Sequence, residues 1–260
     1  MRDIVLSLFD YTGVAVQPWV NAGFKAYCFD IQHETEATVL NKQTGGALHK
    51  RGLDLYDQKN LAALVQEFKG RVAFIFGFPP CQSLAVSGAL HFASKRAKDP
   101  DFQVRAAGHA MAVADLAEKI RSPFLIENPV SVLSTIWRKP NYKFHPYQYG
   151  GYIPADKASH PQWPDHIAPR DAYSKKTCLW TGGGFIMPAP LPVACESFGA
   201  SRQHQKLGGK SLKTKNIRSA TPRGFSQAVF EANGININED FCPATALAKA
   251  LFSFTPQAAE

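Results

Sequence analysis

The N-terminal half of the chain alternates short apolar runs with amphipathic stretches. The apolar runs have the length of buried strands and lie at residues 3–9, 26–30, 72–76 and 124–126. The amphipathic stretches carry apolar residues every three or four positions, which predicts helices at 16–22, 61–68 and 104–120. This alternation is typical of a doubly wound α/β sheet with helices on both faces.

The C-terminal half has a looser pattern. From residue 137 to residue 176 Pro, Gly and aromatic residues interrupt any period. A basic segment at 201–218 predicts either a solvated loop or a contact with a nucleic-acid backbone. The other elements predicted here are a strand at 177–180, a loop at 182–192 and helices at 222–233 and 244–252.

Composition narrows the class of protein. The chain has 260 residues, enough for one large domain or a domain with a small insert. A net charge of +8 favours a polyanionic partner. The five cysteines are an odd number at irregular spacing without a CxxC pair, so reduced thiols are expected and a structural zinc site is not. No long apolar run or signal-peptide layout occurs, so we expect a cytoplasmic protein without a membrane partner.

Cys81 is the first candidate for chemistry. It lies in the segment Gly-Phe-Pro-Pro-Cys-Gln at residues 77–82, directly after a predicted buried strand. Because the carboxyl ends of parallel strands face the crevice where ligands bind, the thiol is expected at the mouth of a site. There it is either a nucleophile favoured by nearby positive charge or a buried structural cysteine.

Glu127 is the second candidate, because Glu127, Asn128 and Pro129 end the next predicted strand. Alone, this tripeptide also fits a helix cap. A thiolate that adds to C6 of cytosine, with an acid near N3, would make C5 of the ring nucleophilic. Cys81 and Glu127 on neighbouring strand ends would supply both groups.

Four short blocks occur in order along the chain: Pro-Pro-Cys at 79–81, Ala-Val-Ser-Gly at 85–88, Glu-Asn-Pro at 127–129 and Thr-Cys-Leu-Trp at 177–180. Together they resemble the DNA cytosine-5 methyltransferase family, in particular a compact subgroup from phages and prophages. The resemblance implies a Rossmann-like doubly wound S-adenosylmethionine-dependent methyltransferase sheet with a small recognition insert. It also implies transfer of a methyl group to C5 of a cytosine flipped out of double-stranded DNA, with S-adenosylhomocysteine as the product and protection against restriction as a role.

The same resemblance implies a set of cofactor contacts. Residues 8–13 resemble the loop against the methionine part of the cofactor, Asp30 the residue that binds the ribose hydroxyls, and Asp54 the residue that meets the adenine amino group. Residues 218–224 resemble the block that completes the pocket. The implied contacts are Phe9, Asp10, Thr12, Gly13, Asp30, Ile31, Asp54, Leu55, Phe78, Pro79, Thr221, Pro222 and Gly224.

The chain departs from the family where two arginines usually help to hold the cytosine. Ser-Lys-Lys-Thr stands there at 174–177, which leaves this role to Lys175 or Lys176. Residues 83–103 resemble a mobile loop that closes over flipped DNA. The DNA contacts implied are Ser87, Gly88, Lys95, Arg96, Arg202, Lys206, Lys210 and Lys213.

The expected organisation is a catalytic domain at 1–180 and 216–260, with a basic recognition segment at 181–215 and a possible second insert at 150–173. We expect a monomer, with a dimer left open. His160, His166 and Trp163 in the second insert are expected to pack or face solvent rather than to bind a metal.

Three alternatives stay open at this point. The first is transfer of a modified group, such as carboxymethyl, from a derivative of S-adenosylmethionine. The second is methylation of a pyrimidine nucleotide, since thymidylate synthases also attack C6 with a Pro-Cys segment. The third is a DNA-binding decoy that has lost catalysis.

Overall fold

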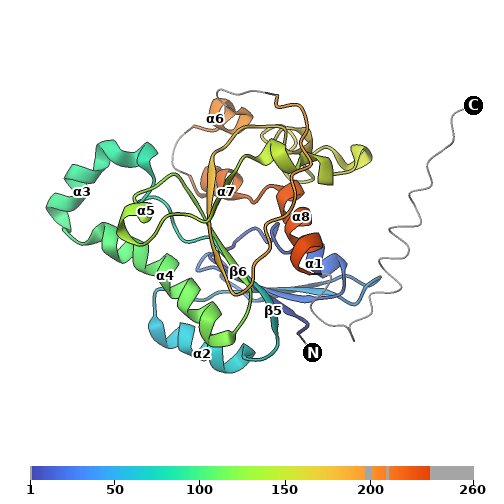
Figure 1. Ribbon diagram of the computed structural model, residues 1–260, viewed down its shortest axis with the longest axis horizontal. Helices are drawn as coiled ribbons and strands as arrows, with labels where there is room; N and C mark the ends of the chain where they lie inside the picture. The colour runs from blue at the N-terminus through green and yellow to red at the C-terminus, as the bar shows by residue number, and fades with distance from the viewer. Residues whose placement is uncertain (1, 197–200, 209–210, 235–260) are drawn as a thin grey trace, which may run out of the picture.

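The computed structural model describes residues 2–196, 201–208 and 211–234. Within these residues the fold is one mixed sheet flanked by helices (Figure 1). The strands are β1 (Ile4–Leu8), β2 (Lys25–Phe29), β3 (Ala37–Leu40), β4 (Ala47–Arg51), β5 (Val72–Gly77), β6 (Phe124–Pro129), β7 (Tyr142–Phe144) and β8 (Thr177–Gly182).

The strand order is β3-β4-β2-β1-β5-β6-β8-β7. Strands β4, β2, β1, β5 and β6 are parallel, while β3 and β8 run antiparallel to their neighbours. From β1 the chain winds outward through β2 and β4, then returns to β5 on the other side of β1. The junction of β1 and β5 is therefore the topological switch point, where open α/β sheets bind ligands.

The α-helices occupy both faces of the sheet. They are α1 (Gln17–Asn21), α2 (Gln58–Phe68), α3 (Phe92–Lys98), α4 (Phe102–Ile120), α5 (Leu133–Ile136), α6 (Arg202–Lys206), α7 (Leu212–Ser219) and α8 (Arg223–Asn233). Figure 1 shows α2 and α4 together on one side of the sheet and α1 with α8 on the other. Short 3-10 helices are η1 (Val86–His91), η2 (Pro146–Tyr152), η3 (Ala155–Lys157) and η4 (Pro169–Asp171).

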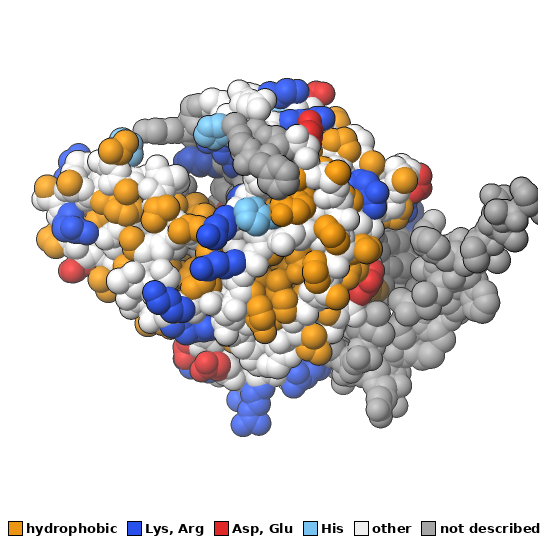
Figure 2. All heavy atoms as spheres, turned by 45° about the horizontal axis from the view of Figure 1, so that its top comes forward, with side chains coloured by type: hydrophobic (Ala, Val, Ile, Leu, Met, Phe, Trp, Pro, Cys, Tyr) orange, Lys and Arg blue, Asp and Glu red, His pale blue; other side chains and the backbone are white. Residues whose placement is uncertain are grey.

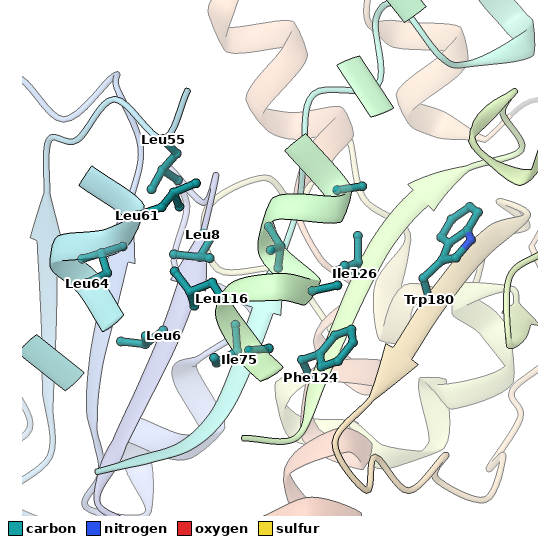
Figure 3. Close-up of a cluster of buried hydrophobic side chains, with 14 of the residues drawn as sticks. Leu6, Leu8, Leu55, Leu61, Leu64, Ile75, Leu116, Phe124, Ile126 and Trp180 are labelled. Atoms are coloured by element: carbon teal, nitrogen blue, oxygen red, sulfur yellow. The ribbon is translucent and has the colours of Figure 1, made fainter. Parts of the chain in front are cut away.

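The pleat of β1 divides its side chains between two cores. Leu6 and Leu8 point to the face covered by α2 and α4, where Leu116 of α4 lies over β5 (Figure 3). Val5 points to the other face, where Trp19 of α1 belongs to the core that α8 also covers. Because all five residues of β1 are buried, this strand forms the centre of the sheet.

Most of the predicted elements are confirmed. The strands predicted at 3–9, 26–30, 72–76, 124–126 and 177–180 correspond to β1, β2, β5, β6 and β8, and the helices at 16–22, 61–68, 104–120 and 222–233 to α1, α2, α4 and α8. The loop predicted at 182–192 is irregular from residue 185 onward. The helix predicted at 244–252 lies outside the described residues.

Several predictions need correction or addition. Residues 83–103 form η1 and α3 rather than a loop, although neither helix buries a residue. The segment 201–218 contains α6 and α7, whose caps Ser201 and Ser211 accept from the backbone of His204 and Thr214. Strand β3 was missed because it is an exposed edge without a buried face. Strand β4 was missed because only its first two residues are buried, and β7 because it has only three residues.

The two predicted inserts pack against each other. Ile167 and Tyr173 from the possible second insert share a small hydrophobic core with Leu207 of the recognition segment and with Ile217 and Ala220. The expected boundary between residues 215 and 216 falls inside α7. Residues 163–173, Leu207 and the residues at 211–220 therefore share one hydrophobic core, which is called the satellite core below.

No helix within the described ranges combines the length and the apolar character needed to cross a bilayer.

Gly77 provides a test of how closely α4 packs on the sheet. A Cβ atom at this residue would lie 2.7 Å from Cγ1 of Val113 in α4. Gly77→Ala is therefore expected to lower the free energy of unfolding by about 1–3 kcal/mol. Gly108→Ala in α4 is the control, because a Cβ there meets nothing within 4 Å; it should raise stability by about 0.5–1 kcal/mol. Urea denaturation measures both, and equal effects would contradict the packing described.

Candidate active site

A cavity of about 520 Å³ opens at the switch point of the sheet. Its walls come from the segments that follow β1, β2, β4 and β5 and from the C-terminal end of β6, with further residues from the segment before β8 and from α7. This volume lies in the range of small-molecule sites, which is roughly 300–1,000 Å³. Cys81 and Glu127 both line it.

Hydrogen bonds join the strand ends that carry Cys81 and Glu127. Strands β5 and β6 are parallel neighbours. The buried Asn128 donates from Nδ2 to the carbonyl oxygen of Pro79 at 3.1 Å. Beyond the strands, Ala85 pairs with Ser131 in an isolated bridge. These contacts hold the loop of Cys81 beside β6, as the sequence predicted for neighbouring strand ends.

Three nearby features act on the thiol of Cys81. Burial raises its pKa most, and the charge of Glu127 raises it further. The ammonium group of Lys175 lowers the pKa, since a positive charge favours the thiolate. Lys175 Nζ lies 3.9 Å from Oε1 of Glu127, so one lysine influences both groups.

The structure distinguishes the two lysines that sequence left as alternatives. Lys175 is half-buried and lines the cavity, whereas Lys176 is exposed and does not. Successive residues of an extended chain point to opposite sides, which accounts for the difference. Of the pair, Lys175 is therefore the residue placed to act on a ligand.

The loop after β1 is held from inside by Asp10. Its buried carboxylate accepts from Ser7 Oγ at 2.7 Å, from the backbone and side chain of Thr12, and from Gly13 N at 2.8 Å. Phe9 has a φ of 59°, a region that costs energy for a residue with a side chain. Phe9, Asp10 and Thr12 line the cavity, while Gly13 lies behind the loop against Leu48.

The segments after β2 and β4 form the opposite end of the cavity. Asp30 lines it and accepts from the backbone and the side chain of Gln32. Apolar walls come from Ile31 and Leu55. Asp54 does not line the cavity: it is exposed, and its carboxylate caps the turn by accepting from Tyr56 N at 2.8 Å. Its expected contact with an adenine amino group stays a prediction.

Of the remaining residues expected to contact the cofactor, some line the cavity and others do not. Phe78, Pro79 and Thr221 line the cavity. Pro222 is buried beside it without lining it. Gly224 is packed away from it in the first turn of α8, where a Cβ would lie 2.2 Å from the carbonyl oxygen of Tyr149.

Sequence reasoning missed two parts of the wall. Tyr56 lines the cavity, with its ring edge-on to His109 of α4 at 4.2 Å between centroids. Helix α7 contributes Leu212, Lys215, Asn216 and Arg218. An aromatic residue close after a strand end could have indicated Tyr56. Nothing local indicates α7, because only the tertiary fold brings it over the cavity.

A second cavity of about 570 Å³ shares Lys175 and Arg218 with the first. Ser87 of η1 and residues of α6 also line it. Figure 2 shows Lys, Arg and His side chains among apolar ones on the viewed surface. Lys175, His204 and Arg218 line the second cavity, and the surface around this cavity is called the basic face below.

Of the expected DNA contacts, Ser87 lines the second cavity, and the others that the structure describes lie outside its lining. Gly88 and Lys95 are half-buried in η1 and α3, and Lys95 Nζ donates to the carbonyl oxygen of Gln82 at 2.9 Å. Arg96 bonds Gln103, and Arg202 pairs with Glu196 at 2.8 Å. Lys206 and Lys213 are exposed, and Lys210 lies outside the described residues.

Histidine 160 stacks on Trp163 and is buried, so these two residues pack as expected. Among the residues the structure describes, no three His, Cys, Asp or Glu side chains converge as a metal site would require.

Comparisons with protein-family models and with curated proteins found no match to this chain.

The role of Lys175 predicts a change in thiol reactivity. Removing its charge by Lys175→Met should raise the pKa of Cys81, so alkylation of this thiol by iodoacetamide should slow near neutral pH and its pH profile should move upward. Lys176→Met is the matched control and should leave the profile in place. Peptide mass spectrometry of Cys81 measures the rates, and a profile unchanged in Lys175→Met would contradict the assignment.

Proposed function

We propose that this protein is a DNA cytosine-5 methyltransferase that uses S-adenosylmethionine, with Cys81 as nucleophile and Glu127 as its partner acid. The observation that carries the proposal is the joint position of these two side chains in one cavity at the switch point. A thiol and a carboxyl group at adjoining strand ends suit covalent attack on a pyrimidine ring. The sequence resemblance supplies the reaction and the substrate.

The far end of the cavity fits the cofactor. Asp30 ends a parallel strand at the place where such sheets bind a ribose, and Ile31, Leu53 and Leu55 offer apolar surface to an adenine ring. The polar loop of Asp10 and Thr12 follows β1 and lines the cavity. Strand β1 lies between β2, which leads to Asp30, and β5, which leads to Cys81. When bound there, S-adenosylmethionine would supply an electrophilic methyl group on a sulfonium.

The residues of the chain then have the following roles. The Cys81 thiolate forms a bond to C6 of the cytosine while Glu127 holds a proton at N3, and the electron pair of the C5–C6 double bond moves to C5. After C5 accepts the methyl group, a base removes the C5 proton, and the electron pair of that C–H bond re-forms the C5–C6 double bond as the C6–S bond breaks. The electron pair of the C6–S bond leaves with Cys81 as the thiolate, and the proton at N3 returns to Glu127. Lys175 supports the thiolate and takes part of the place of the family's arginines.

A DNA strand is the substrate class that fits the surroundings of the cavity. The target base must leave the helix, which costs a few kcal/mol. The second cavity, bordered by Ser87, Lys175 and Arg218, provides a route from the basic face to Cys81. The net charge of +8 favours the phosphate backbone.

A second candidate reaction is transfer of a carboxymethyl group from a derivative of the cofactor. Lys215 and Arg218 in the wall favour it, since each could hold an added carboxylate. The mass of the modified nucleoside distinguishes the two reactions.

The decisive experiment is expression in a host that lacks DNA methylation, followed by nucleoside mass spectrometry and base-resolution sequencing. We expect 5-methylcytosine in the host DNA. Unmodified DNA, together with turnover of free dCMP, would instead indicate the nucleotide-level reaction. Unmodified DNA that the protein still binds would indicate a decoy.

Two substitutions test the covalent mechanism. Cys81→Ala should abolish methyl transfer and leave DNA binding intact, because only the S–C6 bond is lost. Glu127→Gln should lower kcat by at least about 100-fold, since it removes the proton at N3. Methyl transfer from labelled cofactor measures both. Activity that survives in Cys81→Ala would rule out the adduct.

The cofactor assignment predicts different roles for two aspartates. Asp30→Ala should weaken binding of S-adenosylhomocysteine by roughly 10- to 100-fold, because hydrogen bonds from ribose hydroxyls to a carboxylate would be lost. Asp54→Ala should change it by less than about two-fold, since Asp54 is outside the cavity and its loss costs only an exposed turn contact. Isothermal titration calorimetry measures the affinities; the reverse ranking would favour the expectation from sequence.

A further inference from the structure

Helix α7 has one face in the satellite core and another at the cavity. Thr214 and Ile217 are buried, whereas Lys215 and Asn216 line the large cavity. Asn216 donates from Nδ2 to Oε1 of Gln32 at 3.3 Å, which ties the helix to the segment of Asp30. A segment expected to contact DNA thus forms a wall of the small-molecule site.

A second contact ties α7 to the other end of the cavity. Lys175 Nζ donates to the carbonyl oxygen of Arg218 at 3.3 Å, and Lys175 lies beside Glu127. The helix is therefore attached both near Asp30 and near Glu127. Its cavity face lies between the ribose end and the catalytic end of the site.

The acidic groups of the cavity already have partners. Asp10 accepts from Ser7, Thr12 and Gly13. Asp30 accepts from Gln32, and Glu127 pairs with Lys175.

The positively charged side chains that line the cavity differ in whether another residue of the protein binds their charged group. Lys175 pairs with Glu127, and the guanidinium of Arg218 donates to the carbonyl oxygen of Leu207. The ammonium group of Lys215 has neither a hydrogen bond nor an ion pair to any residue in the described part of the chain. Among the cations of the cavity wall, Lys215 is thus the one whose ammonium group has no partner in the described part of the chain.

We propose that Lys215 binds the carboxylate of the amino-acid portion of the cofactor, so that α7 belongs to the cofactor site. This inference rests on the proposed function. The adenine and ribose of such a molecule are accounted for by the apolar wall and by Asp30, while its carboxylate requires a cation or several donors. Lys215 lies on the helix that is tied to both ends of the site, and its charge fits this group.

A pair of ligands isolates the contact. S-adenosylhomocysteine carries the carboxylate, and 5′-methylthioadenosine keeps the adenine, ribose and sulfur but lacks the amino-acid portion. Calorimetry with Lys215→Met should show an affinity for S-adenosylhomocysteine reduced about five-fold, as for a partly exposed ion pair. The affinity for 5′-methylthioadenosine should stay within about two-fold of the unsubstituted protein.

Lys213→Met is the matched control. Lys213 is an exposed lysine of the same helix that does not line the cavity, so this variant loses the same charge. It should bind both ligands like the unsubstituted protein. Lys215→Arg should restore the affinity for S-adenosylhomocysteine, because arginine keeps the charge.

Three outcomes would overturn the inference alone, and a fourth would also overturn the proposed function. Unchanged affinity for S-adenosylhomocysteine in Lys215→Met, or an equal loss for both ligands, would remove the carboxylate contact while leaving the cofactor proposal intact. Equal losses of affinity for S-adenosylhomocysteine in Lys213→Met and Lys215→Met would show that the effect comes from the net charge of the protein and not from a contact of Lys215. Binding of neither ligand by the unsubstituted protein would contradict the proposed function itself.

Discussion

The pairing of β5 with β6 is the constraint on which the rest of the site depends. Each strand ends in a candidate group, Cys81 after β5 and Glu127 within β6. The buried side chain of Asn128 joins the two ends by its hydrogen bond to Pro79. Buried polar contacts of this kind are costly to break, so the separation of thiol and carboxyl group is fixed by the sheet.

Electrostatics adds a requirement that the sheet alone does not meet. Burial and Glu127 both oppose the thiolate form of Cys81. Lys175, from the segment before β8, counters them and approaches Glu127 to 3.9 Å. The segment that leads into the antiparallel strand β8 thus brings a positive charge into the cavity, whereas the charged residues from the parallel strands are acidic. Nucleophile activation and base binding would then depend on the same side chain.

The satellite core connects the small-molecule site with the basic face. It joins residues 163–173 to α7, and α7 forms part of the cavity wall. Lys175 and Arg218 border both cavities. A nucleic-acid strand on the basic face and a ligand at the switch point would therefore contact one continuous surface. The two expected inserts would then contribute to the site itself.

The sequence by itself predicted four of the five parallel strands, β1, β2, β5 and β6, and placed Cys81 and Glu127 at neighbouring strand ends. Buried apolar runs and periodic helices carry strong local patterns, whereas the parallel strand β4 has only two buried residues and was missed. Tertiary structure decided the rest: that Lys175 and not Lys176 enters the cavity, that Asp54 caps a turn outside it, and that α7 covers it. These outcomes depend on contacts between residues far apart in the chain, such as Asn216 with Gln32, and local patterns carry no information about such contacts.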